Sequence, residues 1–562
     1  MNKRSRVLAA LLATTLAATS LAGCGNGGEK QKGKTAQELN FASGSSVIGM
    51  NPMMNSSAPD NSNHSKIQEP LVRYTSLSDT ETKLMPGAAE SWEVSDDGLH
   101  YTFHFHKDMK WSDGEPFTAK DFEYTLKRMA DPKVAAENAW LFEDSIKGFK
   151  DALYNGGEIE NIGVKAPDEN TLEIEIVHPA AYFLELLSKL YPVRQDKIEE
   201  WGDKYGSSAD KIICSGQFKI DKWDQNTETV YVKNENNWNA KNMKLDKITV
   251  KVIQEDATTI QAFLKDQIDV TSTSDPNWQK KIGECKNVVD KTYTATNPQF
   301  FLFNHKNEWL KNPKIRQALT IGFDRQEFVN TIWDGNATPI YSMVPDVMEI
   351  EGKRYTDLVD GKNYFVKDLE KENKDPKKLI KEGLKEMGKD PDPSQITIRY
   401  ASRGTNEFSK KMAEWYKQTW EKNLGIHVDI DMMEWNIMWD KVDSGDYDIA
   451  TAGFGSFYNE PSGILGLFDE KTGYFNATKT GWEGEDADKY HELLLSAQNM
   501  TDQMELADTY LAAEKILEMN AVICPESLGL TPIYIKDYVK GYDVNPVGNV
   551  DWTLMSVETS KK

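Results

Sequence analysis

One segment, residues 86–129, constrains the fold of this chain more than any other. It reads PGAAESWEVSDDGLHYTFHFHKDMKWSDGEPFTAKDFEYTLKRM. Within it, residues 101–106 alternate strictly between aromatic and polar side chains, which is the period-two pattern of a strand with one buried face. The aromatic members are Tyr101, Phe103 and Phe105. A helix should begin at Thr118, because Asp121 three residues later completes a capping box.

Four blocks of this segment have a specific order and spacing: PGAAESW (86–92), YTF (101–103), WSDG (111–114) and TAKDF (118–122). They resemble family 5 of the extracellular solute-binding proteins, which are the oligopeptide-, dipeptide- and nickel-binding receptors of ABC importers. Further similar blocks extend the resemblance over nearly the whole mature chain, among them ICSGQFKI (213–220) and KIRQAL (314–319). The resemblance implies an α/β, two-lobe periplasmic-binding-protein-like fold (type II, cluster C), with an extra domain on lobe one.

The resemblance also implies how the chain is divided. Lobe one is expected in three stretches, residues 38–68, 190–296 and 528–562. The accessory domain is expected at 69–189 and lobe two at 297–527. Strands alternate with helices between residues 396 and 452, which predicts a mainly parallel α/β arrangement in lobe two.

The first 23 residues have the pattern of a signal peptide. Basic residues precede a short apolar stretch of Leu, Ala and Thr, and LAGC at residues 21–24 then resembles a bacterial lipobox. Cleavage before Cys24 would allow acylation there, and several acyl chains on one residue give stable anchoring. Residues 24–37 read as a flexible tether. We therefore expect a lipid-anchored protein on the outer face of the cytoplasmic membrane; the alternative is an ordinary secretory signal with a chance cysteine.

Charge and motifs exclude several classes of function. The formal net charge of −23 disfavours nucleic-acid binding. The sequence contains no HExxH or GxSxG motif, and we expect neither an enzyme nor a cofactor. His104 and His106 share one strand face, but no third metal ligand is evident and we expect no metal.

The richest candidate site is the stretch GFGSFYNEP at residues 453–461, directly after a predicted strand at 447–452. Ligands of α/β proteins usually bind at the carboxyl ends of strands. The candidate ligand-binding residues here are Gly453, Gly455, Phe457, Tyr458, Asn459 and Glu460. In peptide-binding relatives this strand pairs with the peptide backbone, and an Asp in the loop holds the peptide's amino group. Phe457 occupies the position of that Asp and cannot form a charge-assisted hydrogen bond to an ammonium group.

The remaining candidates are scattered along the chain. Arg403 follows a predicted strand and is either an anion clamp or a surface arginine. Trp435 lies four residues before Trp439 on one helix face, and Trp439 is expected in the core. By resemblance to cleft residues of the family, the other candidates are Ala58, Trp140, Ser272, Thr273 and Ser274.

We therefore expect a monomeric substrate-binding lipoprotein that captures peptides or peptide-like ligands by hinge closure and delivers them to an ABC permease. Within the same class, the alternative ligand is an oligosaccharide bound on aromatic side chains. From other classes, the alternatives are a surface signalling receptor or adhesin, and a secreted hydrolase.

Overall fold

The computed structural model describes residues 36–54, 58–78, 81–180, 182–545, 547–548 and 550–558. From Gln37 onward the chain forms one compact unit. The predicted signal peptide and Cys24 lie outside the described residues, as does nearly all of the predicted tether. Of the helices in the described ranges, none is both long and apolar enough to cross a membrane.

Two four-stranded sheets form much of the chain before residue 254. The first has the order β1 (Glu38–Ser43), β10 (Lys247–Val252), β9 (Glu228–Lys233), β8 (Phe218–Asp224). The second has the order β4 (Ala89–Val94), β5 (His100–Phe105), β7 (Thr171–Glu175), β6 (Val164–Lys165). Beside them lies the hairpin β2 (Val72–Ser78) and β3 (Glu81–Pro86). The two sheets pack into one continuous hydrophobic core, which also takes in residues from the end of the chain.

Residues 86–129 supply two strands of the second sheet, β4 and β5, and the helix that follows them. In β5 the three aromatic side chains are buried and the intervening ones are not, which confirms the predicted strand. The helix α2 (Ala119–Met129) follows Thr118, whose backbone N–H donates to the Asp121 carboxylate at 2.8 Å, so the predicted helix start is also confirmed.

A seven-stranded sheet forms the other half of the unit. Its main path is β11 (Val270–Ser272), β19 (Ile523–Lys536), β12 (Val288–Phe303), β18 (Ile449–Gly453), β16 (Thr397–Arg403), β17 (His427–Met433), and β13 (Ala337–Pro339) pairs with β19. The three strands between residues 396 and 453 run parallel to one another, as predicted, whereas β12 is antiparallel to both β18 and β19. The expectation of a mainly parallel arrangement is wrong for the sheet as a whole, because the chain enters and leaves this half on adjacent strands that run in opposite directions.

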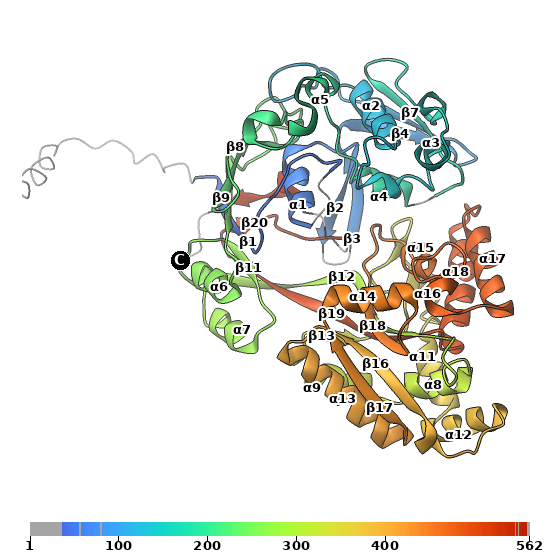
Figure 1. The fold of residues 1–562 in the computed structure, drawn as a ribbon. Helices are drawn as coiled ribbons and strands as arrows, with labels where there is room; N and C mark the ends of the chain where they lie inside the picture. The colour runs from blue at the N-terminus through green and yellow to red at the C-terminus, as the bar shows by residue number, and fades with distance from the viewer. Residues whose placement is uncertain are drawn as a thin grey trace, which may run out of the picture. The chain divides into compact units, whose positions relative to one another are not determined.

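These two long strands connect the halves. β12 and β19 pair from Val288↔Lys536 to Leu302↔Ile523, and Figure 1 shows them extending from the region of β1 to the region of β18. The pairing shifts register between Thr294 and Pro298. A bulge of this kind bends a strand locally and so provides a natural place for a hinge.

The half built on the seven-stranded sheet has hydrophobic cores of its own, separate from the core of the other half. Two buried clusters lie on opposite faces of the seven-stranded sheet, since Phe301 and Phe303 point into one while Phe300 and Leu302 point into the other. On the Phe301 side, the ring of Trp420 from α13 (Glu407–Leu424) packs at 5.2 Å. The cores therefore separate the unit into two lobes.

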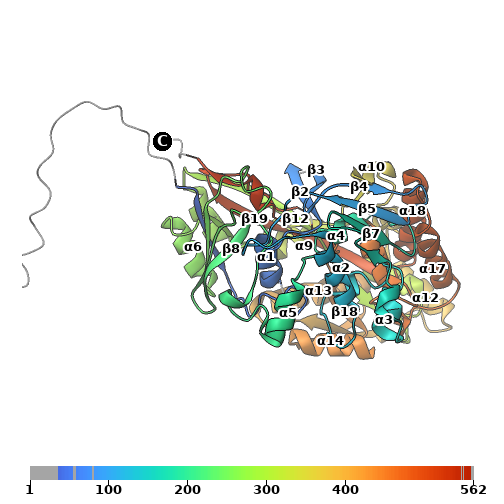
Figure 2. The same cartoon turned by 90° about the horizontal axis from the view of Figure 1, so that it is seen from above.

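The helices complete both halves. Before β12 they are α1 (Ala58–Ile67), α2, α3 (Phe149–Tyr154), α4 (Phe183–Leu187), α5 (Gln195–Trp201), α6 (Asp256–Leu264) and α7 (Pro276–Gly283). After β12 they are α8 (Pro313–Ile321), α9 (Arg325–Ile332), α10 (Tyr355–Leu358), α11 (Phe365–Glu372), α12 (Pro376–Glu386), α13, α14 (Trp435–Ser444), α15 (Ser462–Leu465), α16 (Ala477–Thr480), α17 (Glu485–Ala497) and α18 (Gln503–Met519). Two short antiparallel strand pairs, β14 (Glu349–Ile350) with β15 (Lys353–Arg354) and β20 (Val539–Lys540) with β21 (Ser556–Val557), finish the fold. Helices α17 and α18 pack side by side at one edge (Figures 1 and 2).

Candidate functional site

The carboxyl ends of β16 and β18 form a polar edge. Gly453, the last residue of β18, pairs with Gln299 on β12. A Cβ atom at residue 453 would stand 2.4 Å from the side-chain nitrogen of Gln299, so glycine allows this amide to lie across the strand end. The Gln299 oxygen in turn accepts a hydrogen bond of 2.7 Å from Arg403, the last residue of β16. A partly exposed cation thus lies where α/β sheets usually bind ligands.

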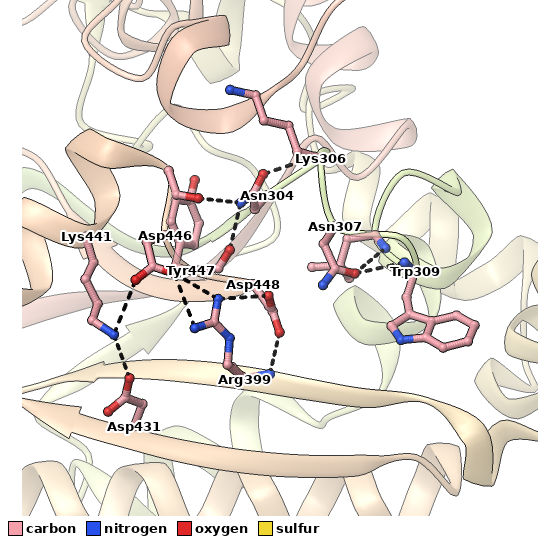
Figure 3. Close-up of polar contacts among 12 residues, drawn as sticks. Asn304, Lys306, Asn307, Trp309, Arg399, Asp431, Lys441, Asp446, Tyr447 and Asp448 are labelled. Atoms are coloured by element: carbon pink, nitrogen blue, oxygen red, sulfur yellow. Dashed lines mark hydrogen bonds and ion pairs between the residues drawn. The ribbon is translucent and has the colours of Figure 1, made fainter.

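A charged network lies near the amino ends of β16 and β18, away from the polar edge (Figure 3). The Arg399 guanidinium lies 3.2 Å from Asp446 and 3.4 Å from Asp448, and its backbone N–H donates to Asp448 at 2.8 Å. The Asn304 amide donates to the carbonyl oxygen of Tyr447 at 2.7 Å. These bonds tie β12, β16 and β18 together and thereby fix the register that brings Gly453 opposite its partner on β12.

The loop after β18 is fastened to the bulge of β12. The Ser456 N–H donates to the Thr296 carbonyl at 3.0 Å, and the Ser456 hydroxyl donates to the Tyr458 carbonyl at 2.5 Å. Thr296 lies in the register shift between Thr294 and Pro298. The candidate loop is therefore attached directly to the proposed hinge, so a change of hinge angle would move it.

Aromatic side chains of this loop meet aromatic side chains of the other half. Phe457 and Trp140 make an edge-to-face pair with centroids 4.5 Å apart, and both remain substantially exposed. Tyr458 stacks on Tyr182 at 4.1 Å. The Lys189 ammonium lies 5.5 Å from the Phe457 ring. Two of the predicted ligand residues, Trp140 and Phe457, are thus brought together from distant segments of the chain.

Asn459 joins the halves instead of lining an open surface. It is fully buried, its backbone N–H donates to the Glu185 carboxylate at 2.6 Å, and its side-chain amide donates to the Tyr74 hydroxyl at 3.1 Å. Desolvation raises the pKa of Glu185 to about 8; the Asn459 N–H opposes this shift, while Glu460 and Glu349 add to it by like-charge repulsion. The carboxylate is therefore costly to ionise while the contact is made.

Glu460 makes its hydrogen bonds within its own lobe. It is 2% exposed, and its carboxylate accepts hydrogen bonds from the backbone N–H and the hydroxyl of Ser462. Burial raises its pKa to about 7. An enclosed acid with these partners is poorly placed to take the position of the acid that Phe457 replaces.

The other predicted residues lie apart from the loop. Ser272 ends β11, the Thr273 hydroxyl accepts from the Asp275 N–H at 3.2 Å, and the Ser274 carbonyl accepts from the Asn336 amide at 3.2 Å. These three residues thus end a strand and lead through a turn toward α7. Ala58 begins α1 and Trp435 begins α14, and their side chains lie outside the described part of the structure. A Cβ atom at residue 455 would stand 3.7 Å from Asn297, an ordinary van der Waals distance, so close packing does not require a glycine there.

Sequence reasoning missed Glu185, Lys189 and Gln299. Glu185 lies in the apolar helix α4 (FLELL), where a lone acid could have indicated a buried partner. Lys189 follows on the same apolar stretch, and burial lowers the pKa of its ammonium to about 8. Gln299 had no signal of its own in the sequence, because its role depends on the register between β12 and β18.

Sequence reasoning also passed over a match to a phosphate-binding pattern. Residues 28–35 read GEKQKGKT, which fits GxxxxGK[ST] by its letters. This pattern holds phosphate only where it joins a strand to a helix. The match falls in the predicted tether, outside the described residues, and no apolar strand pattern precedes it directly in the sequence. It therefore does not change the expectation that the chain uses no cofactor.

Within the described ranges, no three His, Cys, Asp or Glu side chains are grouped as metal ligands. The two histidines near the end of β5 make separate contacts, since His106 stacks on Trp238 at 3.8 Å and His104 lies 3.9 Å from Glu93. The arrangement at the polar edge offers hydrogen bonds, one cation and aromatic surface, which suit reversible binding.

Comparison with known proteins identifies the family. The model of the bacterial extracellular solute-binding proteins, family 5, matches residues 83–476. The chain belongs to this family. Over 542 residues, 93% of this chain and 94% of the relative, it is 30% identical to the oligopeptide-binding protein OppA of Bacillus subtilis.

Solved structures of family relatives have the same fold. The substrate-binding domain of an oligopeptide ABC transporter from Bacillus anthracis superposes with a TM-score of 0.70 at 27% identity, covering 94% of this family-5 chain and 99% of that one. Haemophilus influenzae OppA in complex with the peptide RPPGFSPFR gives a TM-score of 0.71 at 25% identity, covering 93% and 99%. The predicted two-lobe, type II fold is thereby confirmed.

Proposed function

We propose that this family-5 protein is the substrate-binding lipoprotein of an ABC importer and that it captures peptides or peptide-like ligands. The observation that carries the proposal is the polar edge at Gly453 and Arg403, from which a loop leads directly to the contact between the lobes. Such a loop can sense a ligand and couple its presence to the hinge. The names of the relatives, which include oligopeptide- and dipeptide-binding proteins, support the peptide as ligand.

Backbone pairing is the proposed mode of binding. β16 pairs with β18 only as far as Ala450, whereas β12 pairs with β18 as far as Gly453. The segment from Gly453 to Gly455 is partly exposed. An extended peptide can add there as a further strand, which gives affinity without dependence on side-chain identity. Arg403 beside this edge suits an anionic group of the ligand.

Lobe closure is the proposed mechanism. The boundaries expected at residues 68, 189, 296 and 527 would allow lobe two to turn against lobe one and its accessory domain about β12 and β19. The closed form would then dock on the permease. We also propose that residues 1–23 are removed and that Cys24 carries the lipid, so that the receptor stays near its permease.

The proposal is tested by identifying the ligand. The mature protein, truncated before Gln37, is purified under native conditions, and whatever co-purifies is released and analysed by mass spectrometry. Peptides should be found, and small-angle scattering with a saturating peptide should give a smaller radius of gyration than without. Recovery of oligosaccharides alone would favour the alternative ligand, for which the Trp140–Phe457 pair offers an aromatic platform. Identical scattering curves with bound peptide would refute closure.

A further inference from the structure

A cavity of about 740 Å³ lies between the two halves, beside the candidate loop. One side is formed by residues from the stretches 140–145 and 178–180 with Tyr182 and Leu186, and the other by several residues between Phe457 and Thr472 together with parts of α17 and α18. Its volume falls in the range of about 300–1,000 Å³ that is typical of ligand sites, and such sites often lie between domains. The cavity is therefore large enough for several amino-acid side chains.

Aromatic and aliphatic side chains form much of the wall of this cavity. Two interlobe ring pairs line it, Trp140 with Phe457 and Tyr182 with Tyr458. Leu495 of α17 adds an aliphatic side chain that is 46% exposed. Large apolar side chains left exposed around a concavity mark a surface that binds something. Because each ring pair has one member on each half, opening the hinge would part the rings and admit a chain between them.

The charges of the lining indicate which end of a peptide it suits. The acidic residues Glu143, Asp144, Glu460 and Asp469 line the cavity, against the ammonium groups of Lys150 and Lys471. Asp469 is paired with His491 at 2.7 Å. Lys150 is already paired with Asp144 at 2.6 Å. The lining therefore has an excess of negative charge, whereas the edge at the start of the loop carries the cation Arg403. A peptide laid along the loop is attracted with its carboxylate end toward Arg403 and its amino end toward the cavity.

We propose that this cavity is an extension of the ligand site, which takes apolar residues at the amino-terminal end of a longer peptide. The proposal rests on the proposed peptide-binding function and makes it more specific. It also gives a role to Phe457. With no acid at this position the amino group is not fixed in the loop, so the peptide continues past the ring into the cavity.

Calorimetry with three peptides tests the proposal: penta-alanine (AAAAA), the amino-extended peptide LFAAAAA and the carboxyl-extended peptide AAAAAFL. The wild type should bind LFAAAAA at least tenfold more tightly than penta-alanine, which is about 1.4 kcal/mol. In Gln498→Trp, an added ring fills the cavity from an exposed lining position, so this gain should be lost while the affinity for penta-alanine is kept. Glu492→Trp, an exposed position on α17 outside the lining, is the matched control and should keep the gain.

The outcomes separate the two proposals. If penta-alanine binds but the amino-terminal extension gives no gain, or if Gln498→Trp leaves the gain intact, the cavity is not an extension of the site, while peptide binding stands. If AAAAAFL shows the same gain and the same sensitivity to Gln498→Trp, the proposed orientation is wrong. If none of the three peptides binds, the peptide-binding function fails together with the inference.

Discussion

Replacing Glu185 with Gln should change how ligand affinity depends on pH. In the interlobe contact the pKa of Glu185 is raised to about 8, whereas a carboxyl group exposed to water titrates near 4.5. The contact therefore takes up a proton. Its contribution to closure is fully present below about pH 4.5 and is lost as the pH rises toward about 8. Glu185→Gln keeps an oxygen that can accept from the Asn459 N–H but has no charge to desolvate.

The size of the effect follows from the shift. For a group that takes up one proton, each pH unit changes the binding free energy by at most about 1.4 kcal/mol. Between pH 6 and pH 8 the largest possible loss of binding free energy is therefore about 2.7 kcal/mol, or roughly 100-fold in affinity. Glu185 is only partly buried, and solvent screening reduces this loss. We expect about a fivefold weakening of wild-type binding over this interval, or about 1 kcal/mol, relative to Glu185→Gln.

Calorimetric titration of one peptide, penta-alanine, at pH 6, 7 and 8 measures the difference. Groups that do not interact with Glu185 affect both proteins equally and cancel in the ratio of the two affinities. Glu460, whose pKa is about 7, repels the Glu185 carboxylate, so its titration adds to the difference between the two proteins. Lys189, whose pKa is lowered to about 8, sets the upper limit of the useful range. Glu173→Gln, at an exposed position of β7, should behave like the wild type. Parallel pH profiles for the wild type and Glu185→Gln would refute the argument that this carboxyl group is desolvated by lobe contact.

Three further predictions concern other parts of the chain. Acetylation of the peptide's amino group should change wild-type affinity by less than about threefold, under 1 kcal/mol, but weaken binding to Phe457→Asp, as measured by calorimetry; a tenfold loss in the wild type would mean that another group reads the amine. Cys24→Ala should move the protein out of the membrane fraction in cell fractionation, and retention there would refute lipid anchoring through this residue. Asn406 caps α13 by accepting from the Ser409 N–H at 2.8 Å, so Asn406→Ala should lower the free energy of unfolding by about 1 kcal/mol in denaturant titration, and an unchanged midpoint would contradict this.

Local patterns predicted local structure well. The aromatic alternation of β5 and the capping box at Thr118 depend on neighbouring residues, and both occur as expected. The direction of every strand in the large sheet could not be read in the same way, because β12 and β19 acquire their direction from the path between lobes. Trp439 was expected in the core, and it stacks on Phe475 at 6.0 Å, partly buried.

The candidate site was harder to predict because its residues meet only through tertiary contacts. Asn459 and Glu460 were predicted as ligand-binding residues of the loop, but both are buried. Burial of Asn459 is imposed by Glu185, which lies 274 residues earlier in the chain. Likewise, Trp140 and Phe457 each read as cleft residues by resemblance, but their mutual contact is a property of the assembled lobes.

The pairing of β12 with β19 has a consequence for how this protein could be taken apart. The half between Phe300 and Cys524 begins and ends on strands that are direct neighbours in the sheet, with Phe301 opposite Cys524. Antiparallel partners have Cα atoms about 5 Å apart, so a few glycines could close these ends. This half therefore has its own cores and adjacent ends, which suit its exchange as one piece between relatives. The candidate loop would be exchanged with it, so the recipient would have to supply partners equivalent to Thr296, Glu185 and Tyr74.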